Sequence, residues 1–246
     1  MSNLSSFILQ AGPTGPTGPT GAASTVTGPT GSISNPAAGT TSTPPITFTS
    51  GTNTTTAVAG AMEYDGNEFF LSPASSSRAI VPSVYWARQH ATRALTSSTS
   101  VQKIFGVGTN GALSLPIGVY FFECHLFLTG MSGTTGNGAF SIPSGTATTT
   151  NFFMQVVGLD ATTQTTAAAV SGGSTATSAT GALVAVTGTG TSLSAIIRGT
   201  FEVTSAGTII PSFALTTGIA ATVAIGTFFM CYRLGGASDV SFGNWS

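Results

Sequence analysis

The sequence predicts an all-β protein with a collagen-like N-terminal stalk and an antiparallel jelly-roll or β-sandwich head, assembled as a homotrimer. Two observations lead to this prediction. Gly-X-Y triplets occupy residues 12–33, and short strand-like runs separated by Gly-rich turns fill residues 81–246. Only glycine fits at the axis of a collagen triple helix, which requires three parallel chains. Many short strands with Gly-rich turns are typical of β-sandwiches and jelly rolls.

The triplets of residues 12–33 form an interrupted stalk. Four consecutive triplets and, after a break at residues 24–27, two more begin with the glycines Gly12, Gly15, Gly18, Gly21, Gly28 and Gly31. Proline at the X position favours the polyproline II backbone of a triple helix. A flexible Pro/Gly linker is the alternative. Because so few triplets cannot trimerise alone, we expect another part of the chain to hold three copies together.

Residues 1–11 are predicted to be an attachment peptide. A parallel trimer places its three N-termini at one end, and Phe7, Ile8 and Leu9 supply an apolar anchor there. The Thr/Ser/Pro-rich residues 34–56, with Pro44-Pro45, predict an extended linker. The C-terminus would then point away from the attachment point.

Residues 57–80 predict a β-hairpin. Two strand-like runs flank Asp65-Gly66, and Asp-Gly between such runs is a strong hairpin signal. An isolated hairpin is marginally stable, so we expect this one to pack against its symmetry mates.

Residues 81–246 predict the head. Residues 84–95 are compatible with a helix or a strand, and the alternation of Trp86, Arg88, His90 and Thr92 favours a strand. The nearly continuous apolar run 119–128 predicts a strand buried on both faces. Residues 195–204 alternate, with Ile197, Gly199, Phe201 and Val203 on one side and Arg198, Thr200, Glu202 and Thr204 on the other. Further strands are expected at 151–157, 181–186, 208–215 and 222–233.

Composition excludes several functions. The 246 residues carry a net charge of -1 and only 5% charged side chains, against about 25% in ordinary soluble domains. Six Lys and Arg residues provide no basic surface for nucleic acid. The longest apolar run, 219–234, is interrupted by Thr222, Gly226 and Thr227 and is too short to span a membrane as a helix. Residues 1–10 lack the basic start of a secretory signal, so we expect cytoplasmic assembly and no membrane insertion.

The reactive side chains give no catalytic constellation. Glu123 and His125 are two residues apart on one predicted strand and therefore lie on the same face. They could be an acid–base pair or two metal ligands. We favour a third interpretation, in which His125 is a core or interface histidine whose hydrogen bonds are satisfied. Cys124 and Cys231 lie in apolar runs and predict buried free thiols. We therefore predict no catalytic, cofactor-binding or metal-binding residues, and no enzymatic activity.

The charged side chains are expected to form pairs. The acids Glu63, Asp65 and Glu68 surround the predicted turn, where turn chemistry and an ion pair are favoured over a calcium site. Arg198 and Glu202 should pair with a neighbouring strand or protomer. Most of the basic residues lie near the start of the head: Arg78, Arg88, Arg93 and Lys103. We expect them either to pair with those three acids of a neighbouring protomer or to bind an acidic capsid surface.

One stretch resembles a known type of head. Residues 115–125, Leu-Pro-Ile-Gly-Val-Tyr-Phe-Phe-Glu-Cys-His, are similar to a strand of the trimeric jelly-roll heads of the complement first component and tumour necrosis factor family. Ile117 departs from that family's Pro-Gly pattern. The resemblance implies a trimeric jelly-roll head following a collagen stalk, in the order found here.

A second resemblance covers more of the chain. The Gly-Pro-Thr stalk, the Gly-Ala-Met-Glu-Tyr-Asp-Gly segment at 60–66 and the Thr/Gly/Ala-rich head up to Trp245 resemble fibre and surface proteins of tailed-phage virions. This implies a non-enzymatic homotrimeric virion protein, either a capsid decoration or a head fibre. Its expected partners are itself, the major capsid protein or another virion protein, and a host-surface glycan. The alternatives are a tail fibre or receptor-binding protein, and a bacterial surface collagen-like glycoprotein.

Overall fold

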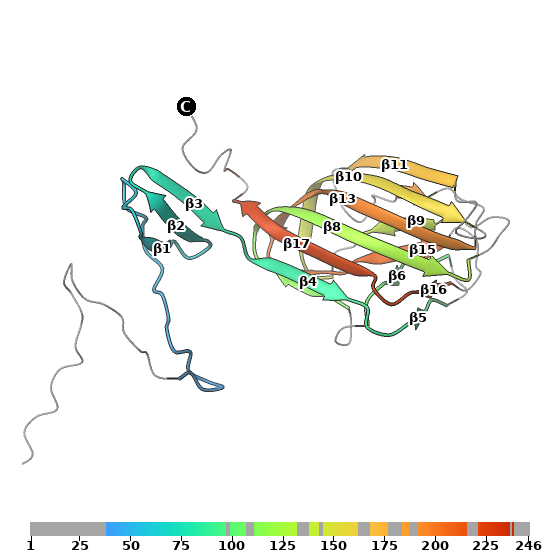
Figure 1. The fold of residues 1–246 in the computed structure, drawn as a ribbon, viewed down its shortest axis with the longest axis horizontal. Helices are drawn as coiled ribbons and strands as arrows, with labels where there is room; N and C mark the ends of the chain where they lie inside the picture. Colours follow the sequence, from blue (N-terminus) through green and yellow to red (C-terminus); the bar gives the residue numbers. More distant parts are fainter. Residues whose placement is uncertain are drawn as a thin grey trace, which may run out of the picture. The chain divides into compact units, whose positions relative to one another are not determined.

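The chain divides into two units, Met1–Phe48 and Thr49–Ser246. A computed structural model describes residues 38–96, 99–106, 111–131, 138–142, 145–161, 168–176, 184–186, 191–215, 221–236 and 238. Of the first unit only residues 38–48 are described, and they contain no strand. The described residues of the second unit form strands without any helix (Figure 1), and every strand pairing among them is antiparallel.

A small three-stranded sheet begins the second unit. Its strands lie in the order β1 (Met62–Tyr64), β2 (Phe69–Ala74) and β3 (Ser77–Val81). The predicted turn joins β1 to β2, with the Asp65 carboxylate accepting the backbone N–H groups of Asn67 and Glu68, each at 2.8 Å. Gly66 has a φ of 101°, which a residue with a side chain rarely adopts. The hairpin is therefore present, and β3 extends it.

The head is built on a large sheet of eight strands. Strands β11, β10, β13 and β8 lie side by side; beyond β8, one part of the edge pairs with β17 and then β4, and the other with β16 and then β5. The strands are β4 (Val84–Arg88), β5 (Arg93–Ala94), β8 (Gly118–Thr129), β10 (Thr148–Ala161), β11 (Ala168–Ala176), β13 (Ser192–Ser205), β16 (Thr222–Val223) and β17 (Phe228–Gly235).

Two smaller sheets complete the head. One has the order β12 (Val184–Val186), β9 (Gly138–Ser141), β15 (Ser212–Leu215) and β6 (Gln102–Lys103), and the other pairs β14 (Gly207–Ile209) with β7 (Leu113–Leu115). Buried side chains from the large and the smaller sheets belong to one hydrophobic core, an arrangement consistent with a β-sandwich.

The centre of this core is an aromatic cluster around Phe122 of β8. Its ring centroid lies 5.7–6.3 Å from those of four other rings, which are Phe140, Phe152, Phe201 and Phe229. Gly199 of β13 faces the same cluster, where an added Cβ would lie 2.8 Å from the Phe122 ring and 1.9 Å from the Phe153 carbonyl. Glycine at this position lets the ring pack directly against the backbone.

Several sequence predictions are confirmed. The all-β fold is present, residues 84–95 contain strands β4 and β5, and Ile197, Phe201 and Val203 are buried on one side of β13. Cys124 and Cys231 are buried free thiols, and burial raises the pKa of both, that of Cys231 to about 12. The predicted runs 208–215 and 222–233 are each divided into two strands.

One prediction is wrong for the single chain. Strand β8 is not buried on both faces, because its residues alternate between buried and half-buried from Gly118 to Leu128. One face packs into the core, and no layer of the described chain covers the other face completely.

Some predictions concern residues that the structure does not describe. The attachment residues Phe7, Ile8 and Leu9 and the stalk glycines Gly12, Gly15, Gly18, Gly21, Gly28 and Gly31 lie outside the described residues. The same is true of residues 34–37 of the predicted linker and residues 181–183 of a predicted strand.

A buried ion pair joins the small sheet to the head. Arg233 of β17 donates through Nη1 to the Glu68 carboxylate, and their side chains are 7% and 5% exposed. Tyr85 and Tyr120 lie within the electrostatic reach of this pair, and burial raises the pKa of both phenols. Because only residues 82 and 83 connect β3 to β4, the pair is a second connection between the two parts.

We expect Glu68→Gln to lower the free energy of unfolding by about 3–5 kcal/mol, because it leaves a buried guanidinium without its counter-charge. Chemical denaturation at a fixed protein concentration measures the change. The double variant Glu68→Gln/Arg233→Met should recover part of the loss, since it removes both charges. Glu63→Gln, in the more exposed pair with Arg78, is the control and should have a much smaller effect; equal losses in both single variants would contradict the role of burial.

Candidate interaction face

The face of the large sheet that points away from the core carries exposed apolar side chains. Side chains on a strand alternate between its two faces, so the buried row of β8 leaves the alternate residues Phe121, Glu123, His125 and Phe127 on this side. We call the surface formed by these residues and their cross-strand neighbours on β4, β10, β13 and β17 the outward face.

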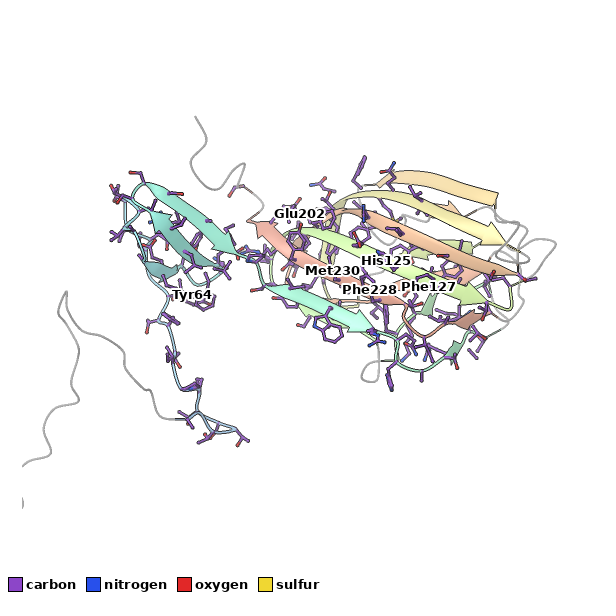
Figure 2. All side chains as sticks on the ribbon, in the orientation of Figure 1. Tyr64, His125, Phe127, Glu202, Phe228 and Met230 are labelled. Carbon is purple, nitrogen blue, oxygen red and sulfur yellow. The ribbon has the colours of Figure 1, made fainter. Side chains whose placement is uncertain are left out.

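The strand registers place the side chains of the outward face in three cross-strand rows. The first row, from β4 to β10, is Val84, Tyr232, Phe121, Thr200 and Phe153. The second row is Trp86, Met230, Glu123, Arg198 and Gln155. The third row is Arg88, Phe228, His125, Ile196 and Val157. Figure 2 labels Met230, Phe228, His125 and Phe127 on the adjacent strands β17 and β8.

The outward face is largely apolar and exposed. Its exposed large apolar side chains are Val84 (54%), Trp86 (67%), Phe153 (57%), Val157 (58%) and Ile196 (37%). Five strands ~4.8 Å apart, each with about six residues, cover roughly 500 Å². The apolar side chains occupy only part of this area, because Glu123, Arg198 and Gln155 lie in its middle row. Exposed apolar side chains gathered on one face mark interaction sites in soluble proteins. This size and composition make the face a candidate interaction surface.

A charged cluster lies in the middle of the outward face. The Glu123 carboxylate accepts Arg198 Nε at 2.5 Å, and its other oxygen lies 2.7 Å from His125 Nε2. The His125 ring stacks on Phe228, with centroids 4.5 Å apart. Both oxygens of the Glu123 carboxylate therefore have partners, and the side chain is only 15% exposed.

The surroundings of Glu123 determine its protonation. Partial burial alone would raise its pKa, but the hydrogen bonds from His125 and Arg198 and the positive charge of the Arg198 guanidinium outweigh burial and lower it below the ordinary value. The carboxylate therefore stays ionised at neutral pH and is held in place by its neighbours. In this state the carboxylate accepts hydrogen bonds and has no proton to donate.

Arg198 is a partner of Glu123 that the sequence alone did not predict. Arg198 is 75 residues from Glu123 in the chain, and only the register between β8 and β13 brings them together. Among the described residues, no group of three or more His, Cys, Asp or Glu could hold a metal ion. Glu123 and His125 thus have their partners, Arg198 and Phe228, within the same chain.

Arg198 and Glu202 both contact side chains of neighbouring strands. Glu202 of β13 accepts hydrogen bonds from Thr150 and Asn151 of β10, and Arg198 pairs across to β8. The prediction that Arg198 and Glu202 pair with a neighbouring strand is therefore confirmed. Asn151 has a φ of 49° at a register shift between β10 and β13, which places its amide near Glu202.

The acids around the small-sheet turn have partners within their own chain, so the predicted pairing between protomers is wrong for them. Glu63 pairs with Arg78 at 2.7 Å, Asp65 accepts backbone N–H groups of its turn, and Glu68 pairs with Arg233. A hydrogen bond from the Thr54 backbone N–H is the main cause that lowers the pKa of Glu63. Of the basic group, Arg93 donates to the Lys103 carbonyl at 3.2 Å.

No protein-family model matches the chain, and no curated protein matches it. In the part of the chain that the structure describes, no helix is long and apolar enough to cross a membrane.

We expect Glu123→Gln to destabilise the protein at neutral pH but not in acid. Because the pKa of Glu123 is lower in the folded protein than its ordinary 4.5, the ionised carboxylate stabilises the fold above that pH. The contribution is lost as the pH falls through the lowered pKa. Thermal unfolding of both proteins from pH 7 to pH 3 should show their difference shrinking in acid.

Glu202→Gln is the control for this pH series, because Glu202 accepts from an amide and a hydroxyl rather than from cations. A difference between the wild type and Glu123→Gln that stays constant with pH would contradict the ionised state of Glu123.

Proposed function

We propose that this chain is a non-enzymatic structural protein of a tailed-phage virion, a homotrimer anchored by its N-terminus that projects a β head from the particle. Capsid decoration or a head fibre is the favoured location. The observation that carries the self-association in this proposal is the outward face of the large sheet, where exposed apolar side chains surround a satisfied ionic cluster. Such a face is suited to association with copies of itself. The virion location is supported by the resemblance of the chain to fibre and surface proteins of tailed-phage virions.

The composition supports self-association. Only 5% of the residues are charged, and the mean hydropathy is +0.37, so a lone copy would expose much apolar surface to water. Covering the outward face with another copy would bury the half-exposed Phe121 and Phe127 of β8. The Gly-X-Y triplets favour three copies, since a collagen triple helix contains three chains.

The strand order supports the jelly-roll part of the proposal. Two sheets contain the four-strand orders β4-β17-β8-β13 and β6-β15-β9-β12. Along the chain these eight strands change sheet at every step except from β9 to β12, which both lie in the smaller sheet. This is the strand order of a jelly roll made of two Greek keys. This order is also compatible with the resemblance of residues 115–125 to a strand of trimeric jelly-roll heads.

The ionic cluster gives the outward face a preferred partner orientation. Glu123, His125 and Arg198 are already paired within one chain, so covering them leaves no isolated buried charge. Arg198 is 57% exposed, so a partner that covers it must offer its guanidinium a hydrogen-bond acceptor or leave it in contact with water. Polar groups within an apolar interface fix its register in this way.

Two other functions would use the same chain differently. A tail fibre or receptor-binding protein would present the head to a host-surface glycan. A bacterial surface collagen-like glycoprotein would carry sugars on the threonines at the Y positions of residues 12–33. Mass measurement of the intact chain distinguishes the latter, because added hexose would favour the glycoprotein and an unmodified mass the virion protein.

The full chain should sediment as a trimer. Ile196→Glu places a charge on the outward face of each copy, and we expect it to raise the concentration at which the trimer dissociates by on the order of tenfold or more, because a desolvated charge opposes association. Ile225→Glu is the matched control, since Ile225 is 56% exposed in the turn before β17. A monomeric wild-type chain in sedimentation equilibrium would refute the homotrimer.

Attachment is tested by removing residues 1–10. The truncated chain should remain a trimer but should be absent from assembled particles, because the apolar anchor Phe7-Ile8-Leu9 is lost. Immunogold labelling of particles detects the protein and shows whether it lies on the head or the tail. Normal incorporation of the truncated chain would contradict the anchor.

A further inference from the structure

The outer sides of the two main sheets of the head are covered to different extents. In the smaller sheet all four residues of β15 are buried, and so are Phe140, Ser141 and Ile142 in and beside β9. Consecutive buried residues mean that both sides of a strand are covered. In β8 and β17 of the large sheet, buried residues alternate with more exposed ones. Among the described strands, the chain therefore covers the outer side of the smaller sheet and leaves the outward face more open.

The symmetry of the proposed homotrimer limits how the outward face can be covered. Two outward faces that meet each other make a twofold contact, in which a surface contacts its own copy, and such a contact closes at two chains. In a ring of three, each contact joins a surface of one copy to a different surface of the next. Three outward faces turned towards one axis therefore meet at opposite edges, with β4 of one copy beside β13 and β10 of the next.

The direction of the axis determines which residues meet. The chain enters the head from the small sheet at the start of β4, and Glu68 of that sheet bonds to Arg233 at the same end of β17. An axis that leads from the small sheets into the heads therefore runs along the strands. A rotation about this axis keeps each residue at its height, so a cross-strand row on one copy faces the same row on the next. In the second row, Trp86 of one copy then faces Arg198 of the next.

The side chains of Trp86 and Arg198 suit a contact between copies. Trp86 is 67% exposed and Arg198 is 57% exposed. Within one chain they lie three strand spacings, about 14 Å, apart, with Met230 and Glu123 between them. A guanidinium stacks on an indole ring through cation–π attraction. Because Arg198 Nε is bonded to Glu123, an indole over the flat side of the guanidinium would leave the donors at its edge to Glu123 and to water.

We propose that Trp86 of each copy stacks on Arg198 of the next copy, so that three such contacts close the trimer. This inference rests on the proposed homotrimer and names two residues that join its copies. Tryptophan and arginine are enriched among the residues that contribute most of the binding energy of protein interfaces. The contact also gives the covered cation an attractive neighbour, which a purely aliphatic partner would not.

A double-mutant cycle tests the contact in the full chain. Trp86→Ala should raise the dissociation concentration of the trimer by on the order of tenfold or more, because it removes the ring from all three contacts. In the background of Arg198→Gln, the same substitution should change the dissociation concentration much less. Side chains about 14 Å apart in one chain act independently, so this coupling comes from a contact between copies. Ile225→Ala, in the exposed turn before β17, should change dissociation little.

Thiol cross-linking tests the arrangement without changing the charged cluster. Trp86→Cys is combined with Gln155→Cys, at the opposite end of the second row, at a protein concentration where this variant sediments as a trimer. A short bismaleimide should then give covalent trimers, because each copy supplies one thiol to each of its two contacts. The matched control, Ile225→Cys with Gln155→Cys, should give on the order of tenfold less, because its two thiols do not face each other. The native Cys124 and Cys231 are buried with raised pKa values, so they should not react.

The outcomes separate this inference from the proposed function. A wild-type chain that sediments as a monomer overturns both. Two results with a wild-type trimer overturn the contact between Trp86 and Arg198 and leave the trimeric function standing. One is that Trp86→Ala has the same effect with and without Arg198→Gln, and the other is that Trp86→Cys with Gln155→Cys cross-links no better than its control.

Discussion

The packing of the inner side chains of β8 is the interaction on which the rest of the head depends. Phe122 lies among four other aromatic rings that come from β9, β10, β13 and β17. Because strand side chains alternate, a shift of one residue would exchange the two faces of β8. The aromatic cluster therefore fixes the core and also determines which residues meet on the outward face, including Glu123 beside Arg198.

The local pattern of the sequence was sufficient to predict most of the strands and the turn at Asp65-Gly66. Alternation identified the buried side of β13, and the apolar context identified Cys124 and Cys231 as buried thiols. These features depend on neighbours in the chain, for which periodicity and turn chemistry are direct signals.

The features that the sequence could not provide depend on long-range register. Arg198 meets Glu123 across 75 residues, and Arg233 meets Glu68 across 165 residues; no local pattern specifies either pair. The prediction for β8 failed for a related reason. A nearly continuous apolar run does not say whether the same chain covers both of its faces. In β8, Glu123 and His125 interrupt the outer face, and the described chain covers the inner face only.

The connection between the small sheet and the head has a mechanical consequence. Residues 82 and 83 join β3 to β4, an edge strand, while the Glu68–Arg233 pair joins the small sheet directly to β17, which lies between β4 and the central strand β8. A pull on the N-terminal side of the molecule is thus divided between the peptide link and the ion pair. The part of the force that the ion pair transmits acts on β17 and on the core beside it rather than on the edge strand β4 alone. The head therefore resists separation of its edge strand.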